Sequence, residues 1–228
     1  MSKFPLPIKA VVIDLDGTLL HTAPDLAEAS NRMLAELGMP PVSVEKVTSY
    51  VGNGVAQLIK RVLTGTMHDE PAPELYERAR KIYDRHYGEV FHLYSRPFPG
   101  VLEGLDAFKK AGYRMGCITN KIAKYTEPVL QATGLRDYFD LVLSGDTLPK
   151  MKPDPMPLLY ACEQWKVRPD EMLLIGDSAN DTQAARAAGC HVFCVPYGYN
   201  HGRDVRELDS DAVVDGLVEA VALIRKAA

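Results

Sequence analysis

A short apolar run that ends in two aspartates constrains this chain more than any other stretch. Residues Ala10 to Ile13 carry no polar side chain, as expected of a parallel strand buried on both faces. Asp14 and Asp16 follow, and the two-residue period of a strand places them on the same side. Each alone is equally a turn or helix-cap residue. Because ligands of open α/β sheets bind at the carboxyl ends of strands, the pair predicts a polar site there.

The pattern of the remaining chain divides into a helical block and an alternating block. Helices are expected over residues 23–37, 43–51, 55–63 and 74–94, before any further strand. Strands are then expected at 114–119, 141–143, 172–175 and 191–195, alternating with helices at 101–111, 124–132, 155–165, 180–188 and 217–226. This alternation predicts an α/β fold with a doubly wound parallel sheet, a Rossmann-like core. We expect residues 1–19 and 97–228 to form that core and residues 20–96 to form an inserted all-helical cap domain.

Two later segments place polar groups where a phosphate could bind. CITNK carries Thr119, Asn120 and Lys121 at a strand end, where a hydroxyl and the following N–H groups suit a phosphate. KMKPDP holds Lys152 in a proline-restricted segment, and a fixed ammonium suits a phosphate or a carboxylate. Read separately, these are also ordinary loop residues and a solvated lysine.

A further segment, GDSANDTQAARAAG, repeats the pattern of a buried strand followed by acids. Asp177 follows the strand directly, and Asp181 lies in the first turn of the next helix. Either aspartate alone has a simple role at a helix N-terminus. Three carboxylates at one sheet edge would repel one another, about 4 kcal/mol for a pair 4 Å apart at an effective dielectric near 20. Asp14, Asp16 and Asp177 would therefore need a cation, and carboxylates with waters and a phosphate suit Mg²⁺.

These four segments resemble, in order and separation, the motifs of the haloacid dehalogenase-like hydrolase superfamily. The helical insertion matches its helical-cap subtype. Within the superfamily the chain is most similar to the phosphoglycolate phosphatases, through YVGNGVAQLIKRVL, TNK and GDSANDTQAARAAGC. His21 departs from the pattern, since relatives often carry an acid there. The resemblance implies a Mg²⁺-dependent phosphatase that hydrolyses a small phosphomonoester, first of all 2-phosphoglycolate, through an aspartyl-phosphate.

The resemblance also implies a role for each motif residue. Asp14 would be the nucleophile and Asp16 the general acid and base. Mg²⁺ would be bound by Asp14, the backbone carbonyl of Asp16, and Asp177. Thr119 and Lys152 would hold the phosphoryl oxygens with N–H groups after Asp14 and Asn120, and Asp181 would orient Lys152 or a metal-bound water.

The insertion contributes candidates for the rest of the substrate. Gly52, Asn53 and Gly54 directly precede a helix, so their N–H groups could receive a small anion such as a glycolate carboxylate. Arg61 lies about two turns further along. It is a candidate contact, and equally a solvated surface arginine. Lys121 is a further cationic candidate.

The composition of the chain limits the kinds of partner that it is expected to bind. The net charge is −4, and no long basic run is present, which argues against nucleic-acid binding. No stretch approaches the roughly 18 apolar residues of a membrane span, and the N-terminus lacks a signal-peptide core. The four cysteines form no C-x-x-C pair, so we expect buried thiols in a cytoplasmic protein. The expected partner is a small phosphate ester, with a monomer or homodimer as the assembly.

Other functions stay open at this point. The nearest alternative is a related phosphatase for pyrophosphate or a sugar phosphate. A phosphomutase is a further one, and it must protect its phosphoenzyme from water. A dehalogenase needs neither the acid/base Asp16 nor Mg²⁺. A catalytically silent binding protein predicts damage to Asp14, Asp16, Lys152 or Asp177, and all four residues are present.

Overall fold

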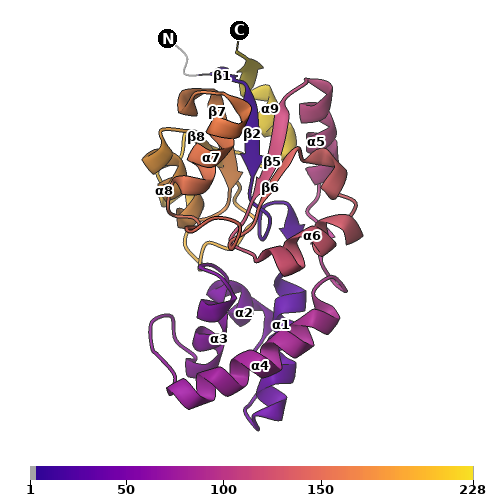
Figure 1. Ribbon diagram of the computed structural model, residues 1–228, viewed down its shortest axis with the longest axis vertical. Helices are drawn as coiled ribbons and strands as arrows, with labels where there is room; N and C mark the ends of the chain where they lie inside the picture. The colour runs from indigo at the N-terminus through magenta and orange to yellow at the C-terminus, as the bar shows by residue number, and fades with distance from the viewer. Residues whose placement is uncertain (1–3, 228) are drawn as a thin grey trace.

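A parallel six-stranded sheet forms the upper half of the molecule in the computed structural model, which describes residues 4–227 (Figure 1). Its central strand is β2 (Ala10–Ile13), which pairs with β5 on one side and β7 on the other. The strand order is β6-β5-β2-β7-β8-β9. The other five strands are β5 (Arg114–Ile118), β6 (Leu141–Leu143), β7 (Met172–Gly176), β8 (His191–Cys194) and β9 (Ala212–Val213).

Helices cover both faces of this sheet, so the prediction of a doubly wound α/β fold is confirmed. Along β2, Val11 and Ile13 face one apolar core, and Ala10 and Val12 face the other. This alternation buries every residue of the strand. The first core includes α5 (Val101–Lys110), α6 (Ala123–Ala132) and α9 (Leu217–Ala222), and the second includes α7 (Met156–Trp165) and α8 (Ala179–Ala188).

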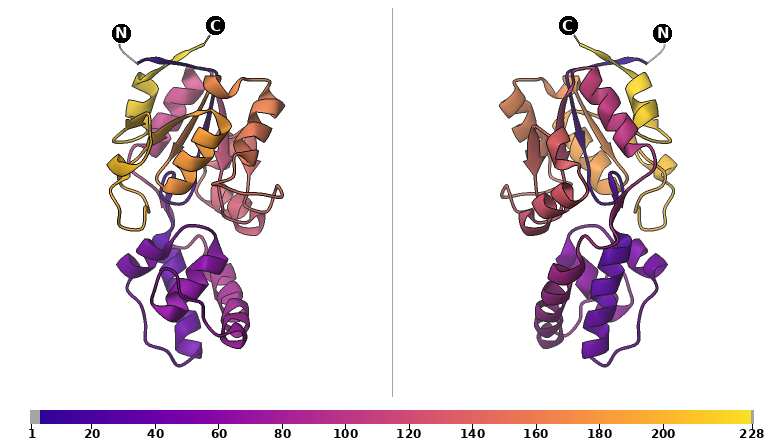
Figure 2. Two further views of the ribbon diagram at one scale, coloured as in Figure 1. Left: turned by 90° about the vertical axis from the view of Figure 1, so that its left-hand side faces the viewer. Right: turned by 90° about the vertical axis from the view of Figure 1, so that its right-hand side faces the viewer.

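Four helices between β2 and β5 form the helical insert, which lies beyond the carboxyl edge of the sheet (Figures 1 and 2). They are α1 (Ala23–Glu36), α2 (Val44–Tyr50), α3 (Val55–Thr64) and α4 (Pro73–Val90), and they share an apolar core of their own. Ser43 caps α2 as predicted, because its side chain accepts a hydrogen bond from the N–H of Lys46.

Two short strands that the sequence did not predict join the insert to the sheet. β3 (Leu20–His21) and β4 (Arg96–Pro97) pair antiparallel, so the chain leaves and re-enters the sheet region side by side. The predicted domain limits, residues 20 and 96, fall within this pair. The division into these two domains stays a prediction. Residues 1–3 and 228, which it assigns to the core, lie outside the described residues.

Two predicted helices end earlier than expected. The helix predicted to reach residue 94 ends at Val90, because the buried Asp25 carboxylate accepts hydrogen bonds from the N–H groups of Tyr94 and Ser95, at 2.8 and 2.9 Å. The last helix ends at Ala222 instead of residue 226. The following residues form β10 (Ile224–Lys226), which pairs with β1 (Leu6–Ile8).

The cysteines and the helices bear on two expectations from composition. The four cysteines are buried and unpaired, as predicted. Within residues 4–227, no helix combines the length and apolar character that crossing a bilayer requires.

Candidate active site

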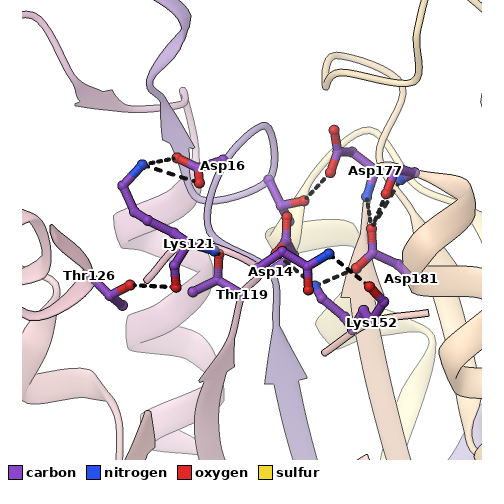
Figure 3. Close-up of polar contacts among 11 residues, drawn as sticks. Asp14, Asp16, Thr119, Lys121, Thr126, Lys152, Asp177 and Asp181 are labelled. Carbon is purple, nitrogen blue, oxygen red and sulfur yellow. Dashed lines mark hydrogen bonds and ion pairs between the residues drawn. The ribbon is translucent and has the colours of Figure 1, made fainter. Parts of the chain in front are cut away.

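The carboxyl ends of β2 and β7 bring together aspartates that are more than 150 residues apart. Ile13 is in register with Ile175, so Asp14 and Asp177 follow their strands at neighbouring levels. Oxygens of Asp14, Asp177 and Asp181 lie within 4.8 Å of one another, and all three side chains are buried (Figure 3). The structure therefore collects a cluster of three carboxylates at the sheet edge where the sequence predicts a site.

Asp181 belongs to this cluster because of how α8 begins. One carboxylate oxygen accepts hydrogen bonds from the backbone and hydroxyl groups of Ser178, at 3.1 and 2.7 Å, which completes a capping box. The other oxygen lies 2.6 Å from the ammonium of Lys152. A Cβ atom on Gly176 would lie 2.3 Å from the Asp181 carboxyl carbon, so only glycine permits this approach. The Asp181 carboxylate therefore caps α8 and contacts Lys152 at the same time.

Lys152 is the cation of the cluster. Its ammonium lies 2.7 Å from Asp14 and 2.6 Å from Asp181, and the residue is only 2% exposed. Burial by itself would lower the pKa of this ammonium, but the two carboxylates outweigh burial and raise it. Lys152 is therefore charged throughout the physiological pH range. The alternative of a solvated lysine is wrong.

The carboxylates are not fully compensated by this lysine. Burial raises the pKa of Asp14 to about 7, against the opposing effect of Lys152. Burial, followed by the charges of Asp14 and Asp181, raises the pKa of Asp177 well above its ordinary value. Among residues 4–227, Lys152 is the only cationic side chain within hydrogen-bond distance of this cluster, where it contacts Asp14 and Asp181. Three acidic oxygens with one such cation fit a hard divalent metal ion.

Two hydrogen bonds hold the Asp177 carboxylate in place. Its carboxylate accepts hydrogen bonds from the Thr18 hydroxyl, at 3.1 Å, and from the N–H of Tyr199. The Tyr199 hydroxyl in turn lies 2.8 Å from His21 Nδ1 and 3.1 Å from the N–H of Ala23. His21 thus contacts Tyr199, in the linker to the insert. Sequence reasoning missed Tyr199, because its partners lie up to 178 residues away.

Asp16 faces the same cavity as Asp14 but has a different partner. Its two carboxylate oxygens lie 3.0 and 3.3 Å from the Lys121 ammonium (Figure 3). Gly17, with φ of +94°, turns the chain here, and a Cβ on it would lie 2.3 Å from an Asp177 oxygen. The side chains of Asp14 and Asp16 therefore line one cavity, each with its own lysine.

The other residues of the second predicted segment lie around the same point. Thr119 follows β5, is almost fully buried, and its hydroxyl accepts a hydrogen bond from the N–H of Lys121 at 3.1 Å. The Asn120 amide donates to the backbone carbonyl of Lys152 at 2.8 Å. Asn120 therefore connects the segment after β5 to the segment that carries the buried lysine.

The insert closes the site from the opposite side with residues 52–54. Gly52, Asn53 and Gly54 line the cavity, and the Asn53 amide donates to the Asn180 side chain at 3.1 Å. Arg61 is buried beneath this loop. Its guanidinium donates to the carbonyls of Tyr50 and Gly52, at 2.8 and 3.1 Å, and to the Asn53 side chain at 3.2 Å. The interpretation of Arg61 as a solvated surface residue is therefore wrong.

The cavity between insert and sheet has a volume of about 320 Å³. That is the size of a small-molecule site, and both halves of the molecule contribute to it. Several lining residues were not predicted from the sequence, namely Arg80, Tyr87, Tyr125, Met151, Asn180 and Tyr199. Most of them carry no motif signal, since they reach the cavity only through the packing of insert against sheet.

Several known proteins resemble this chain in sequence or in structure. A family profile described as haloacid dehalogenase-like hydrolase matches residues 11–195. The chain is 65% identical to a phosphoglycolate phosphatase of Thiobacillus denitrificans over 227 residues, which cover 100% of each chain. It is 59% identical to one of Nitrosospira multiformis, covering 98% of each chain. The crystal structure of a predicted phosphoglycolate phosphatase from Haemophilus somnus superposes with a TM-score of 0.87 at 34% identity, over 93% of this chain and 96% of that one. On its fold, its motif geometry and these similarities, the chain belongs to the haloacid dehalogenase-like hydrolases.

Proposed function

We propose that this protein is a Mg²⁺-dependent phosphatase that hydrolyses 2-phosphoglycolate to glycolate and inorganic phosphate. The substrate follows from full-length relatives, at 65% and 59% identity, that carry the name phosphoglycolate phosphatase. The observation that carries the chemistry is the buried group of Asp14, Asp177 and Asp181 around Lys152, beside Asp16, in a cavity of small-molecule size.

The first step is attack by Asp14 on the phosphorus of the ester. A bond forms between an Asp14 carboxylate oxygen and phosphorus, and the bond from phosphorus to the ester oxygen breaks. Asp16 gives its proton to the departing alkoxide, so that glycolate leaves with a neutral hydroxyl. The ionised form of Asp14 is required here, and Lys152, at 2.7 Å, favours that form.

The second step releases phosphate. A water molecule attacks the phosphorus of the aspartyl-phosphate, its proton passes to Asp16, and the bond to Asp14 breaks. The starting protonation states are restored. Thr119 and Lys152 would hold the phosphoryl oxygens during both steps, with N–H groups after Asp14 and Asn120. Asp181 keeps Lys152 in place through its 2.6 Å contact.

Mg²⁺ would be held by the carboxylates of Asp14 and Asp177 and the backbone carbonyl of Asp16. When bound, it supplies positive charge that offsets the buried carboxylates and the phosphoryl group. The donor set is oxygen only, as Mg²⁺ prefers, and the three buried carboxylates of Asp14, Asp177 and Asp181 have one ammonium beside them within the described part of the chain.

The helical insert, residues 20–96, would act as a cap that excludes water and selects the substrate. In this proposal the glycolate carboxylate lies towards residues Gly52 to Gly54, which line the cavity at the start of α3. Arg61 would contribute indirectly, because its guanidinium holds the carbonyls of this loop.

The test is a substrate panel with and without Mg²⁺. Phosphoglycolate should have the highest kcat/KM among phosphoglycolate, pyrophosphate and hexose phosphates, and EDTA should abolish turnover. A preference for pyrophosphate or a sugar phosphate would replace the proposed substrate, and turnover that persists in EDTA would refute the metal requirement.

The nucleophile is tested by Asp14→Asn, with Asp69→Asn in an exposed loop as the matched control. Asp14→Asn should lower kcat by roughly a thousandfold or more while the protein stays folded. Asp69→Asn should behave as the wild type. Phosphate release by Asp14→Asn within about tenfold of the wild-type rate would refute the assignment.

A further inference from the structure

The ammonium of Lys121 lies between the sheet and the helical insert at a point where both contact it. On the sheet side it lies 3.0 and 3.3 Å from the two oxygens of Asp16. On the insert side it lies over the ring of Tyr87, from α4, at 5.3 Å from the ring centroid. The Lys121 side chain is only 6% exposed. This buried ammonium therefore links the Asp16 carboxylate to the Tyr87 ring of the insert.

We propose that Lys121 is a positioning residue that holds the Asp16 carboxylate towards the leaving oxygen of the substrate, and that Tyr87 completes this arrangement when the insert covers the site. This inference rests on the proposed function, in which Asp16 protonates the leaving alkoxide. It assigns to Lys121 a role in the chemical step, and to Tyr87 a role that none of the sequence motifs indicates.

The first argument is the unequal support of the site carboxylates. Asp181 accepts bonds from Lys152 and from Ser178, and Asp177 accepts bonds from Thr18 and the Tyr199 N–H. Across residues 4–227, by contrast, the Asp16 carboxylate receives hydrogen bonds from Lys121 alone. The Asp14 carboxylate also has one donor within these residues, Lys152, but that donor is itself held by Asp181. A general acid must lie within hydrogen-bond reach of the atom it protonates. Without Lys121, the Asp16 carboxylate would lose the hydrogen bonds that hold it in this structure.

The second argument concerns the aromatic cluster that supports Lys121. Tyr87 is 2% exposed and packs against Tyr83, Phe91 and Tyr125, at ring-centroid distances of 5.5, 6.2 and 4.6 Å. A ring held on three sides offers a fixed face to the ammonium. Tyr87 belongs to the insert, so this face is present only when the insert lies against the sheet. Alignment of Asp16 therefore depends on closure of the site.

Another role for Lys121 is direct binding of the substrate carboxylate, and three substrates separate the two roles. p-Nitrophenyl phosphate has a leaving group that departs without a proton and has no carboxylate. Ethyl phosphate needs the proton and has no carboxylate. Phosphoglycolate has both features. Because kcat/KM covers the steps through the first phosphoryl transfer, the ratio of its values for ethyl and p-nitrophenyl phosphate reports on the general acid.

The experiment compares this ratio in the wild type, Lys121→Met, Lys121→Arg and the control Lys124→Met. Lys124 is exposed and also lies over a tyrosine ring, at 5.1 Å from the Tyr125 centroid, but has no contact with Asp16. Lys121→Met should lower the ratio roughly ten- to a hundredfold, as expected for loss of a charged hydrogen bond. Lys121→Arg should recover most of this loss, and Lys124→Met should match the wild type.

Three results would overturn the inference. If both esters lose activity equally in Lys121→Met, the residue is only structural. If phosphoglycolate loses activity and ethyl phosphate does not, Lys121 binds the substrate carboxylate. If the wild type hydrolyses none of the three substrates with Mg²⁺, the proposed function fails as well. An unchanged ratio in an active, folded variant defeats this inference alone.

The role of Tyr87 is tested by a pair of substitutions that differ in the aromatic face. Tyr87→Phe keeps the face and should keep the ratio. Tyr87→Leu removes the face and should lower the ratio between roughly twofold and thirtyfold, the range of a cation–π contact. Thermal unfolding identifies any variant that is not folded. Equal ratios in the two folded variants would show that the aromatic face does not position Asp16.

Discussion

Replacement of Lys152 by methionine removes the charge around which the buried carboxylates gather and preserves the length of the side chain. The ammonium lies 2.7 Å from Asp14 and 2.6 Å from Asp181, in a residue that is 2% exposed. The substitution therefore leaves two buried carboxylates without their shared cation, next to a third at Asp177.

The expected loss of stability follows from these contacts. Removal of one partner of a buried ion pair costs about 3–5 kcal/mol, because the remaining charge is left unpaired. That value applies at pH 8 without a metal ion. The pKa of Asp14, ordinarily 3.8, is already raised to about 7 by burial and is lowered by Lys152, so it rises further in the variant. As the pH falls towards 6, Asp14 takes up a proton and the loss becomes smaller.

The assay is chemical unfolding of the wild type and Lys152→Met at pH 6 and pH 8, in EDTA and in excess Mg²⁺. Lys150→Met is the matched control, because Lys150 is 62% exposed and pairs with Asp154 at the surface. The control should unfold like the wild type. Mg²⁺ should recover part of the stability of Lys152→Met at pH 8, since it binds the folded state and offsets the same carboxylates.

The reasoning would be refuted by a loss below about 1 kcal/mol at pH 8 in EDTA. It would also be refuted by a loss that increases as the pH falls. Either result would mean that the carboxylates are neutral or solvated in the folded protein, contrary to their burial.

Two further predictions concern the metal and the loop of the insert. In EDTA, the melting temperature of the wild type should fall as the pH rises from about 5.5 to 8. The folded state retains a proton on Asp14 up to a pKa of about 7, whereas the unfolded chain releases it near 3.8. Mg²⁺ should raise the melting temperature more at pH 8 than at pH 5.5, and a larger effect at the lower pH would contradict this. Arg61→Met should lower the free energy of unfolding by about 1–3 kcal/mol, because the carbonyls of Tyr50 and Gly52 lose their donor. It should also raise KM for phosphoglycolate more than it lowers kcat, and unchanged KM in steady-state assays would show that the loop does not contact substrate.

The strands that carry the site were predictable because their signal is local. A strand buried on both faces must be apolar at every position, so β2 and β7 appear as continuous runs, with Asp14 directly after β2 and Gly176-Asp177 at the end of β7. Parallel neighbours end at the same edge, and this rule alone brings Asp14 near Asp177. The start of α2 was also predictable, since Ser43 caps it within three residues.

Elements that depend on distant partners were not predictable. The residue types of Ile224–Lys226 are compatible with a continuing helix. The segment forms a strand instead, because β1 lies beside it. The end of α4 depends on the Asp25 carboxylate, about 70 residues away in sequence. No local window contains either partner, so helical periodicity was extended too far in both places.

The partners of the buried cations were likewise decided by packing. Residue types and spacing identify Lys121, Lys152 and Arg61 as candidates, but each side chain is long enough to reach several acceptors. The fold directs Lys152 to Asp14 and Asp181, Lys121 to Asp16, and Arg61 to carbonyls of its own insert. Spacing along a chain identifies which groups reach the sheet edge, because strands end there in a regular way. Which of those groups pair depends on how the insert and the sheet enclose them, since burial decides where an unpaired charge is too costly.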